Sequence, residues 1–89
     1  MRLLRNLVGR MFSVIVSPKA RKQLERIPAQ YHSGIRIALQ SLAEQPFSGD
    51  KLGGELAGRY RLRLGNYRII YRIEKSVLMV MVIAIGHRQ

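Results

Sequence analysis

The chain has 89 residues, which suffices for one domain with a modest core and leaves no room for a second domain. Sixteen lysine and arginine residues against five aspartate and glutamate residues give a formal charge of +11. An anionic partner is therefore expected: nucleic acid, an acidic protein or an anionic membrane surface. The absence of cysteine excludes a disulfide framework and a thiolate metal site, and it favours a cytoplasmic protein.

The first ten residues mix basic and apolar side chains without the uninterrupted apolar stretch and cleavage site of a signal peptide. We interpret residues 1–10 as an N-terminal extension and residues 11–89 as a single domain, because Met11 opens the first patterned segment. The longest apolar run, residues 77–85, is about half the length of a membrane-spanning helix, so we predict no membrane association.

Residues 12–16 alternate and are rich in β-branched side chains, which predicts a first strand of about five residues. Ser17 and Pro18 then predict a helix start, because the hydroxyl caps the helix and proline fits its first position. Apolar residues follow from Ala20 at i, i+4 and i+7 until Pro28 interrupts this first amphipathic helix.

A second helix of about four turns is predicted from Tyr31 to Leu42, where apolar residues recur with helical spacing. Pro46 marks its end. Residues 46–58 contain four glycines and no sustained period, so we interpret them as a connecting loop.

Five arginines lie in a β-hairpin over residues 59–72, whose two-residue loop is Gly65-Asn66. Alternation places three pairs on a core face: Leu64 with Tyr67, Leu62 with Ile69, and Tyr60 with Tyr71. It places three pairs on the opposite face, here called the arginine face: Arg63 with Arg68, Arg61 with Ile70, and Arg59 with Arg72. Like charges directly opposite each other destabilise a sheet, so we expect this face to bind an anion.

After a turn at residues 74–76, residues 77–85 are apolar on both faces, which is typical of a strand inside a sheet. The predicted order is β-α-α-β-β-β. The predicted fold class is α+β, with two N-terminal helices packed on one face of a mainly antiparallel four-stranded sheet. If the helices cover the core face, the arginine face is left open.

The pattern predicts neither a metal nor a cofactor. His32 and His87 are far apart, the acidic residues have no ligand spacing, and LGGELAG lacks the flanking strand and helix of a phosphate-binding loop. The arginine face instead suits RNA, which carries its own nucleophile, the 2′-hydroxyl. Aligned guanidinium groups promote cleavage by stabilising the charge that develops. Arginine is a poor general base, so His87 is the candidate proton carrier.

Simpler interpretations stay open at this point. Arginines on an exposed strand face are commonly just solvated, and His87 is equally consistent with a surface histidine. Tyr60, Tyr67 and Tyr71 offer rings for base stacking, but their alternation favours the core.

The first strand, the segment SPKARKQLERIP, the second helix, the block KLGGELAGRYRLRLGNYRIIYRI and the ending VIAIGHR together resemble the RelE/ParE toxin superfamily of bacterial toxin–antitoxin systems. The resemblance runs from Met11 to the C-terminus. It implies a RelE-like fold, a cytoplasmic protein and a cognate antitoxin that masks the basic surface. RelE-type members are ribosome-dependent mRNA endonucleases that act without a metal, so the resemblance implies a type II toxin that inhibits translation.

The resemblance carries catalytic positions over one at a time. The two basic residues of the first hairpin strand fall on Arg61 and Arg63, the arginine of the second on Arg68, and the arginine ending the last strand on Arg88. Arg68 is expected to stabilise transition-state charge. Arg61 and Arg63 are expected to orient the phosphate and activate the nucleophile, and Arg88 to hold the RNA backbone.

Further basic residues are expected to bind RNA: Arg59, Arg72 and Lys51. Some members also use an acidic residue just before the KL segment, which is Asp50 here. RelE-type chains commonly continue to a functional tyrosine, whereas this sequence ends at Gln89, so His87 is the alternative group for proton transfer.

The leading hypothesis is an endonuclease that cuts mRNA on the ribosome. One alternative is the ParE-like branch, which inhibits DNA gyrase and cleaves nothing itself. Another is a basic nucleic-acid-binding module without catalysis. All three fit the same arginine face.

Overall fold

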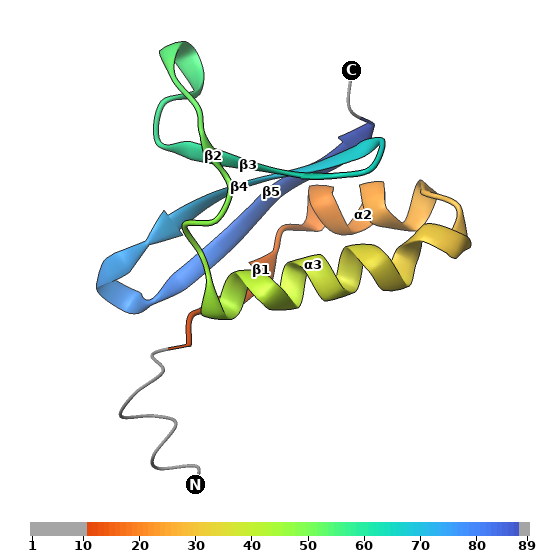
Figure 1. Cartoon of the computed structure of the whole chain (residues 1–89), viewed down its shortest axis with the longest axis horizontal. Coiled ribbons are helices and arrows are strands. Elements are labelled where there is room, and N and C mark those ends of the chain that lie inside the picture. Colours follow the sequence, from red (N-terminus) through yellow and green to blue (C-terminus); the bar gives the residue numbers. More distant parts are fainter. Residues whose placement is uncertain (1–10, 88–89) are drawn as a thin grey trace, which may run out of the picture.

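The computed structural model describes residues 11–87, which form one sheet and two α-helices (Figure 1). In chain order the elements are β1 (Ser13–Val16), α2 (Pro18–Arg26), α3 (His32–Glu44), β2 (Asp50–Lys51), β3 (Arg59–Leu64), β4 (Tyr67–Glu74) and β5 (Met79–His87). Short 3₁₀ turns lie at Ala29–Tyr31, Gly54–Leu56 and Lys75–Val77. The extension proposed for residues 1–10 lies outside the described residues.

The sheet has five strands in the order β1-β5-β4-β3-β2. Only β1 and β5 are parallel, so the mainly antiparallel architecture is confirmed. The predicted count of four strands is wrong, because Asp50 and Lys51 pair with Arg61 and Tyr60 inside the segment expected to be a loop. A two-residue strand is too short to show alternation, which explains the error.

The hairpin register is confirmed at every pair. Arg59 lies opposite Arg72, Tyr60 opposite Tyr71, Arg61 opposite Ile70, Leu62 opposite Ile69, Arg63 opposite Arg68, and Leu64 opposite Tyr67. Gly65 has a φ of 59°, which a two-residue turn of this kind requires. The predicted central position of the last strand also holds, since β5 pairs with β1 on one side and β4 on the other.

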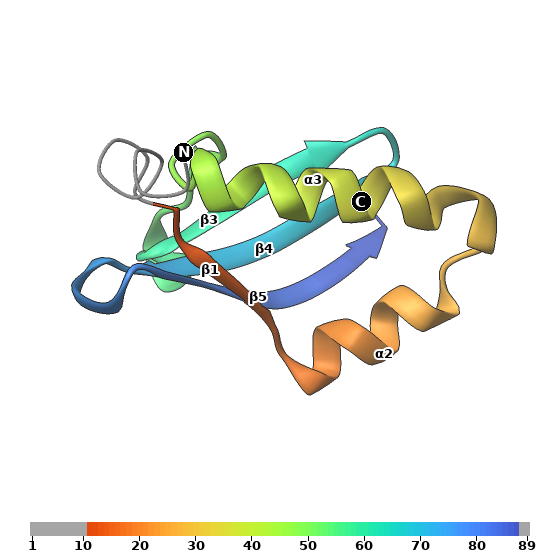
Figure 2. The same ribbon diagram turned by 90° about the horizontal axis from the view of Figure 1, so that it is seen from below.

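Both helices lie on the same side of the sheet. Figure 2 shows α3 running across β3 and β4, with α2 beside β5. Their apolar faces meet the core face of the sheet in one buried cluster: Ala20, Ile27, Ile35, Ala38, Leu39, Leu42, Ile69, Tyr71, Val80, Val82 and Ile85. Tyr60 and Tyr67 pack against this cluster, so the assignment of the three hairpin tyrosines to the core is confirmed.

The N-terminus of α2 covers the part of β5 that β1 does not reach. The Ser17 hydroxyl accepts a hydrogen bond from the Ala20 amide (3.1 Å) and donates one to the Ile83 carbonyl (3.2 Å). Gln23 accepts a hydrogen bond from the Ile85 amide at 2.8 Å. Ile83 lies at a β-bulge, because the pairing of β4 with β5 skips it. These contacts satisfy backbone groups of a strand edge that otherwise stays open.

A single buried hydroxyl fixes the turn that leads into β2. Tyr71 is fully buried, and its hydroxyl donates to the Pro46 carbonyl (2.8 Å) and accepts from the Gly49 amide (3.0 Å). A Cβ atom at Gly49 would lie 2.6 Å from this hydroxyl and 2.8 Å from the Arg61 carbonyl oxygen, so only glycine fits. Burial raises the pKa of Tyr71 above its ordinary value.

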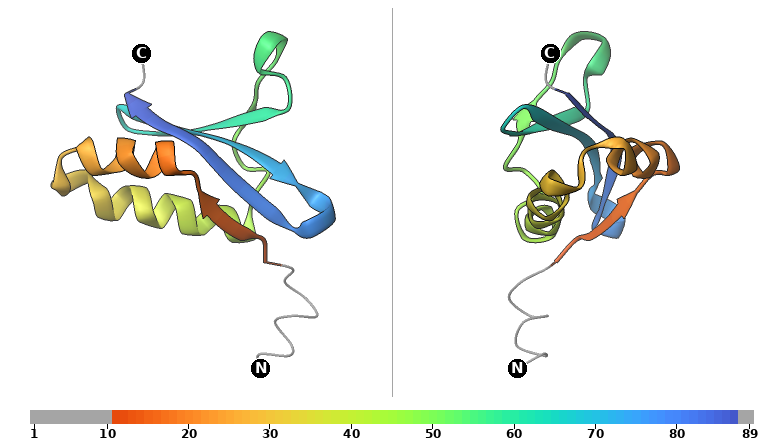
Figure 3. Two further views of the ribbon diagram at one scale, coloured as in Figure 1. Left: turned by 180° about the vertical axis from the view of Figure 1, so that it is seen from behind. Right: turned by 90° about the vertical axis from the view of Figure 1, so that its right-hand side faces the viewer.

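Within residues 11–87, neither α-helix is long and apolar enough to cross a membrane. The two ends of the described chain lie far apart, as the view from behind shows (Figure 3). The end of β5 is close to the hairpin turn, whereas the start of β1 is at the opposite end of the sheet.

Ser17→Ala is expected to lower the free energy of unfolding by about 1–2 kcal/mol, because it removes the cap of α2 and the bond to the bulge of β5. Urea unfolding followed by circular dichroism measures the change. The control is Ser13→Ala, which alters an exposed serine of β1. Equal effects of the two substitutions would contradict the assignment.

Tyr71→Phe is expected to cost about 1–3 kcal/mol at neutral pH, since two backbone groups lose their partner. The raised folded-state pKa means that the stability due to Tyr71 is present below about pH 10 and is lost as the pH rises beyond it. The difference between wild type and variant should therefore be constant up to about pH 9 and shrink as the pH rises above about 10 in urea unfolding. A constant difference would show that the phenol proton is not held more tightly in the folded protein.

Candidate functional site

The arginine face carries five arginines on two neighbouring strands. The register places Arg59, Arg61 and Arg63 of β3 beside Arg68 and Arg72 of β4, all opposite the core face. Both helices lie on the other side of the sheet, so neither covers this surface (Figure 1). The expectation of an open arginine face is therefore met within the described residues.

A hollow of about 380 Å³ lies on this face and is here called the basic hollow. It is lined by Lys19, Leu52, Leu56, Arg59, Arg61, Arg68, Ile70, Ile83 and Ala84. Apolar side chains thus form part of the surface between basic groups. A hollow with this lining suits a phosphate next to the flat face of a base, because guanidinium groups bind phosphate and the apolar part excludes water.

Lys19 is a basic residue of the hollow that no sequence pattern indicated. It follows the proline at the start of α2, and that helix is held against β5 by the bonds from Ser17 and Gln23. Ile83, at the bulge of β5, lines the same hollow. Hydrophobic periodicity gives no signal for such a position, because it depends on how a helix end meets a strand edge.

Two carboxylates partly neutralise the positive charge of the arginine face. Asp50 Oδ2 lies 3.5 Å from Arg61 Nη2 and 3.9 Å from Arg63 Nε. At the far end, Glu74 pairs with Arg72 at 3.6 Å. All of these groups are partly exposed, so the ion pairs contribute little to stability. Their main effect is on the charge that a ligand meets.

Arg61 is more buried than Arg63, its neighbour on β3. Its side chain is 29% exposed, against 55% for Arg63. Its Nε is buried and has no hydrogen-bond partner within the described residues. An unpartnered buried donor is costly, so Arg61 carries a guanidinium group whose hydrogen bonding the described residues leave incomplete.

His87 does not lie with the arginines, contrary to the role expected of it. It is paired with Tyr67, so its side chain is on the core face, and its ring packs edge-on against Tyr67 with centroids 5.2 Å apart. The residue on the arginine face at this level is Gly86, opposite Arg68. The geometry thus gives no support to His87 as the proton carrier of an arginine site.

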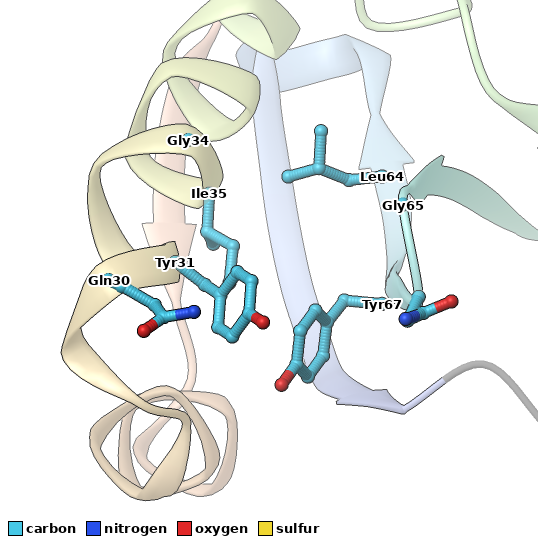
Figure 4. A pocket seen from close by; sticks show the side chains of 8 residues that line it. Gln30, Tyr31, Gly34, Ile35, Leu64, Gly65 and Tyr67 are labelled. Carbon is cyan, nitrogen blue, oxygen red and sulfur yellow. The ribbon is translucent and has the colours of Figure 1, made fainter.

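The neighbourhood of His87 is instead a second hollow of about 330 Å³, between the start of α3 and the hairpin turn. Figure 4 shows the rings of Tyr31 and Tyr67 pointing toward one another, with Ile35 and Leu64 beside them. The ring centroids of the two tyrosines are 5.3 Å apart. This surface is mainly aromatic and aliphatic, and it lies on the opposite side of the sheet from the basic hollow.

The other expected site residues within residues 11–87 also lie on different faces of the sheet. Lys51 is opposite Tyr60, so its side chain lies on the core side of the β2 edge, away from the arginines with which it was grouped. Arg63 and Arg72 lie on the arginine face, outside the lining of the basic hollow. Arg88 lies outside the described residues. Residues 11–87 contain no group of three or more His, Cys, Asp or Glu side chains that could hold a metal ion.

The comparisons with known proteins identify the class of protein to which this architecture belongs. The sequence profile described as "ParE toxin of type II toxin-antitoxin system, parDE" matches residues 14–89. Toxin RelG of Mycobacterium tuberculosis is 30% identical over 79 residues, which are 86% of this chain and 91% of that protein. The chain therefore belongs to the RelE/ParE toxin superfamily.

Solved structures have the same fold. The toxin–antitoxin complex RelBE2 from Mycobacterium tuberculosis contains a chain with 30% identity and a TM-score of 0.80, and the match covers 88% of this chain and 99% of that one. The isolated E. coli RelE toxin has 21% identity and a TM-score of 0.76, covering 88% and 85% of the two chains. The predicted RelE-like α+β architecture is thereby confirmed, with five strands rather than four.

Arg61→Gln is expected to weaken the binding of a single-stranded oligonucleotide, and to reduce the slope of log affinity against log salt by about 0.7 for each phosphate that is no longer neutralised. Fluorescence anisotropy across a salt series measures both quantities. Lys51→Gln removes the same charge on the other side of the sheet and should change neither by much. Equal effects of the two variants would show that binding follows net charge and not the arginine face.

Proposed function

We propose that this protein is the toxin of a type II toxin–antitoxin pair and that it cleaves mRNA on the ribosome through its arginine face. The observation that supports this most is the basic hollow, which gathers Arg59, Arg61, Arg68 and Lys19 around an apolar surface large enough for one nucleotide. The half-buried Arg61 side chain, whose Nε has no hydrogen-bond partner within the described residues, adds a guanidinium group to this surface.

The chemistry needs little from the protein beyond position and charge. In the proposed reaction the 2′-hydroxyl of a nucleotide attacks the adjacent phosphorus and the bond to the 5′-oxygen breaks. The products are a 2′,3′-cyclic phosphate and a 5′-hydroxyl, so the proton lost by the 2′-oxygen is balanced by the one gained at the 5′-oxygen. Guanidinium groups at the phosphate stabilise the negative charge that develops on its oxygens.

The positions of the three arginines of the hollow in the sheet suggest a separate role for each. Arg68 and Arg61 approach the hollow from neighbouring strands, whereas Arg59 is one pair further along β3. We assign transition-state stabilisation to Arg68 and phosphate orientation to Arg61. Arg59, together with Lys19 of α2, then holds the flanking backbone. Arg63 and Arg72 would contact RNA phosphates outside the hollow.

The proposed partner is a cognate antitoxin. The similar chain from Mycobacterium tuberculosis was solved as a toxin–antitoxin complex. The formal charge of +11 suits an acidic partner segment, because opposite charges steer association. An antitoxin that lies across the arginine face would also prevent RNA from reaching it.

Arg68→Ala is expected to reduce cleavage of ribosome-bound mRNA by about 10²–10³-fold, which is the usual cost of losing one preorganised donor to transition-state charge. Toeprinting of a translated message with purified protein measures the cuts. Arg36→Ala, on the exposed side of α3, is the matched control and should cut like the wild type. Circular dichroism checks that both variants are folded.

An intact message at high protein concentration would contradict the proposed activity. If the same preparation stalls DNA gyrase in a supercoiling assay, the ParE-like alternative replaces it. If the protein binds nucleic acid and does neither, the arginine face is a binding surface without catalysis.

A further inference from the structure

Asp50 is the carboxylate in contact with two arginines of the proposed RNA-binding face. Its Oδ2 lies within 3.9 Å of both the Arg61 and the Arg63 side chains, and it is paired with Arg61 across the β2–β3 ladder. The carboxylate thus occupies the kind of position that a phosphate oxygen would take between the two guanidinium groups. It is 60% exposed, so incoming anions meet it directly.

The backbone before Asp50 cannot move away without disturbing the core. Gly49 is held between the Tyr71 hydroxyl and the Arg61 carbonyl, and a single added carbon would collide with both. The same hydroxyl holds the Pro46 carbonyl, and Tyr71 itself is buried and stacked on Tyr60 at 5.5 Å. A core residue therefore sets the position of a surface charge.

We infer that Asp50 is a fixed counter-ion of the Arg61–Arg63 pair, and that Tyr71 is the positioning residue that holds it there. The inference deepens the proposed function and, for its RNA part, rests on it. Asp50 competes with any single anion for the two arginines. It thereby makes the site favour a ligand that carries several phosphates, because only such a ligand also reaches Arg59 and Arg68.

The direction of the effect follows from charge alone. A phosphate on Arg61 would lie close to the Asp50 carboxylate, which is itself 3.5 Å from the Arg61 guanidinium. At a separation of about 5 Å in a well-hydrated site, the repulsion between like charges amounts to roughly a three- to tenfold loss of affinity. A strand of RNA loses the same factor once but gains from each further phosphate that it places on the face. Selectivity for polymer over monomer is the result.

The test uses inorganic phosphate and a noncleavable 2′-O-methyl RNA as separate probes of the full chain. Asp50→Asn should bind inorganic phosphate about three- to tenfold more tightly at low ionic strength, read as a larger rise of the melting temperature at equal phosphate concentration. It should also steepen the salt dependence of RNA binding, by about 0.7, since one more arginine charge is open to phosphate. Because Asp50 is exposed, this variant keeps the fold.

Glu25→Gln is the matched control, since it removes one exposed carboxylate from α2 and raises the net charge equally. Its affinity for phosphate should stay at the wild-type value. If Asp50→Asn binds phosphate no more tightly than Glu25→Gln does, the counter-ion is refuted. Weaker binding by Asp50→Asn also refutes it, because the carboxylate would then act by orienting Arg61.

Tyr71→Phe separates the positioning role from a purely structural one. Where the variant is folded, it should shift phosphate affinity in the same direction as Asp50→Asn but by less. The substitution releases the turn before Asp50, whereas the negative charge of Asp50 remains. In the Asp50→Asn background it should add nothing, and a double-mutant cycle measures this. Unchanged phosphate affinity in folded Tyr71→Phe, or full additivity, would overturn the role of Tyr71.

The outcomes for this inference and for the proposed function are distinguishable. The phosphate measurements contain no RNA and no ribosome, so they decide the counter-ion whatever the natural substrate is. Tighter phosphate binding by Asp50→Asn, together with failure of wild-type protein to cut mRNA, would sustain the counter-ion and remove the endonuclease. If the wild-type protein cuts mRNA and Asp50→Asn binds phosphate no more tightly than the wild type does, the endonuclease is sustained and the counter-ion is refuted.

Discussion

The register of the β3–β4 hairpin is the constraint on which the rest of the molecule depends. With the two-residue turn at Gly65-Asn66, the tyrosines and most aliphatic residues of β3 and β4 face the helices. All five arginines of these two strands face away from the helices. A slip of one residue would bury guanidinium groups against α3 and expose the core, so the turn and the core enforce each other. The site is thus a direct consequence of the same alternation that builds the core.

That arrangement sets like charges opposite each other at two levels of the hairpin, Arg59 with Arg72 and Arg63 with Arg68. Such pairs weaken a sheet, and the fold tolerates them because burial of Ile69, Tyr71 and Ile85 on the other face holds the strands together. The carboxylates of Asp50 and Glu74 offset part of the repulsion. A surface that costs stability in the free protein and suits phosphate is consistent with selection for binding.

Periodicity and turn chemistry were enough to predict the hairpin, both helices and the arginine face, because each rests on local pattern. They did not predict β2, the bulge at Ile83 or the position of Lys19. These features depend on how elements distant in sequence meet, as when the start of α2 covers the edge of β5 beyond β1. His87 shows a different limit: β5 is apolar on both sides, so alternation within it does not reveal which face the histidine takes, and only the pairing with Tyr67 does.

The core and the arginine face are joined most directly at Tyr71. Its hydroxyl is a buried polar group that must be satisfied, and it is satisfied by the Pro46–Gly49 turn. That turn starts β2, and β2 carries the carboxylate beside Arg61 and Arg63. Any change that relaxes the turn therefore alters both stability and the charge that a ligand meets. In a small domain with one core, surface chemistry of this kind does not vary independently of packing, because the residues that fix a surface charge are themselves part of the core.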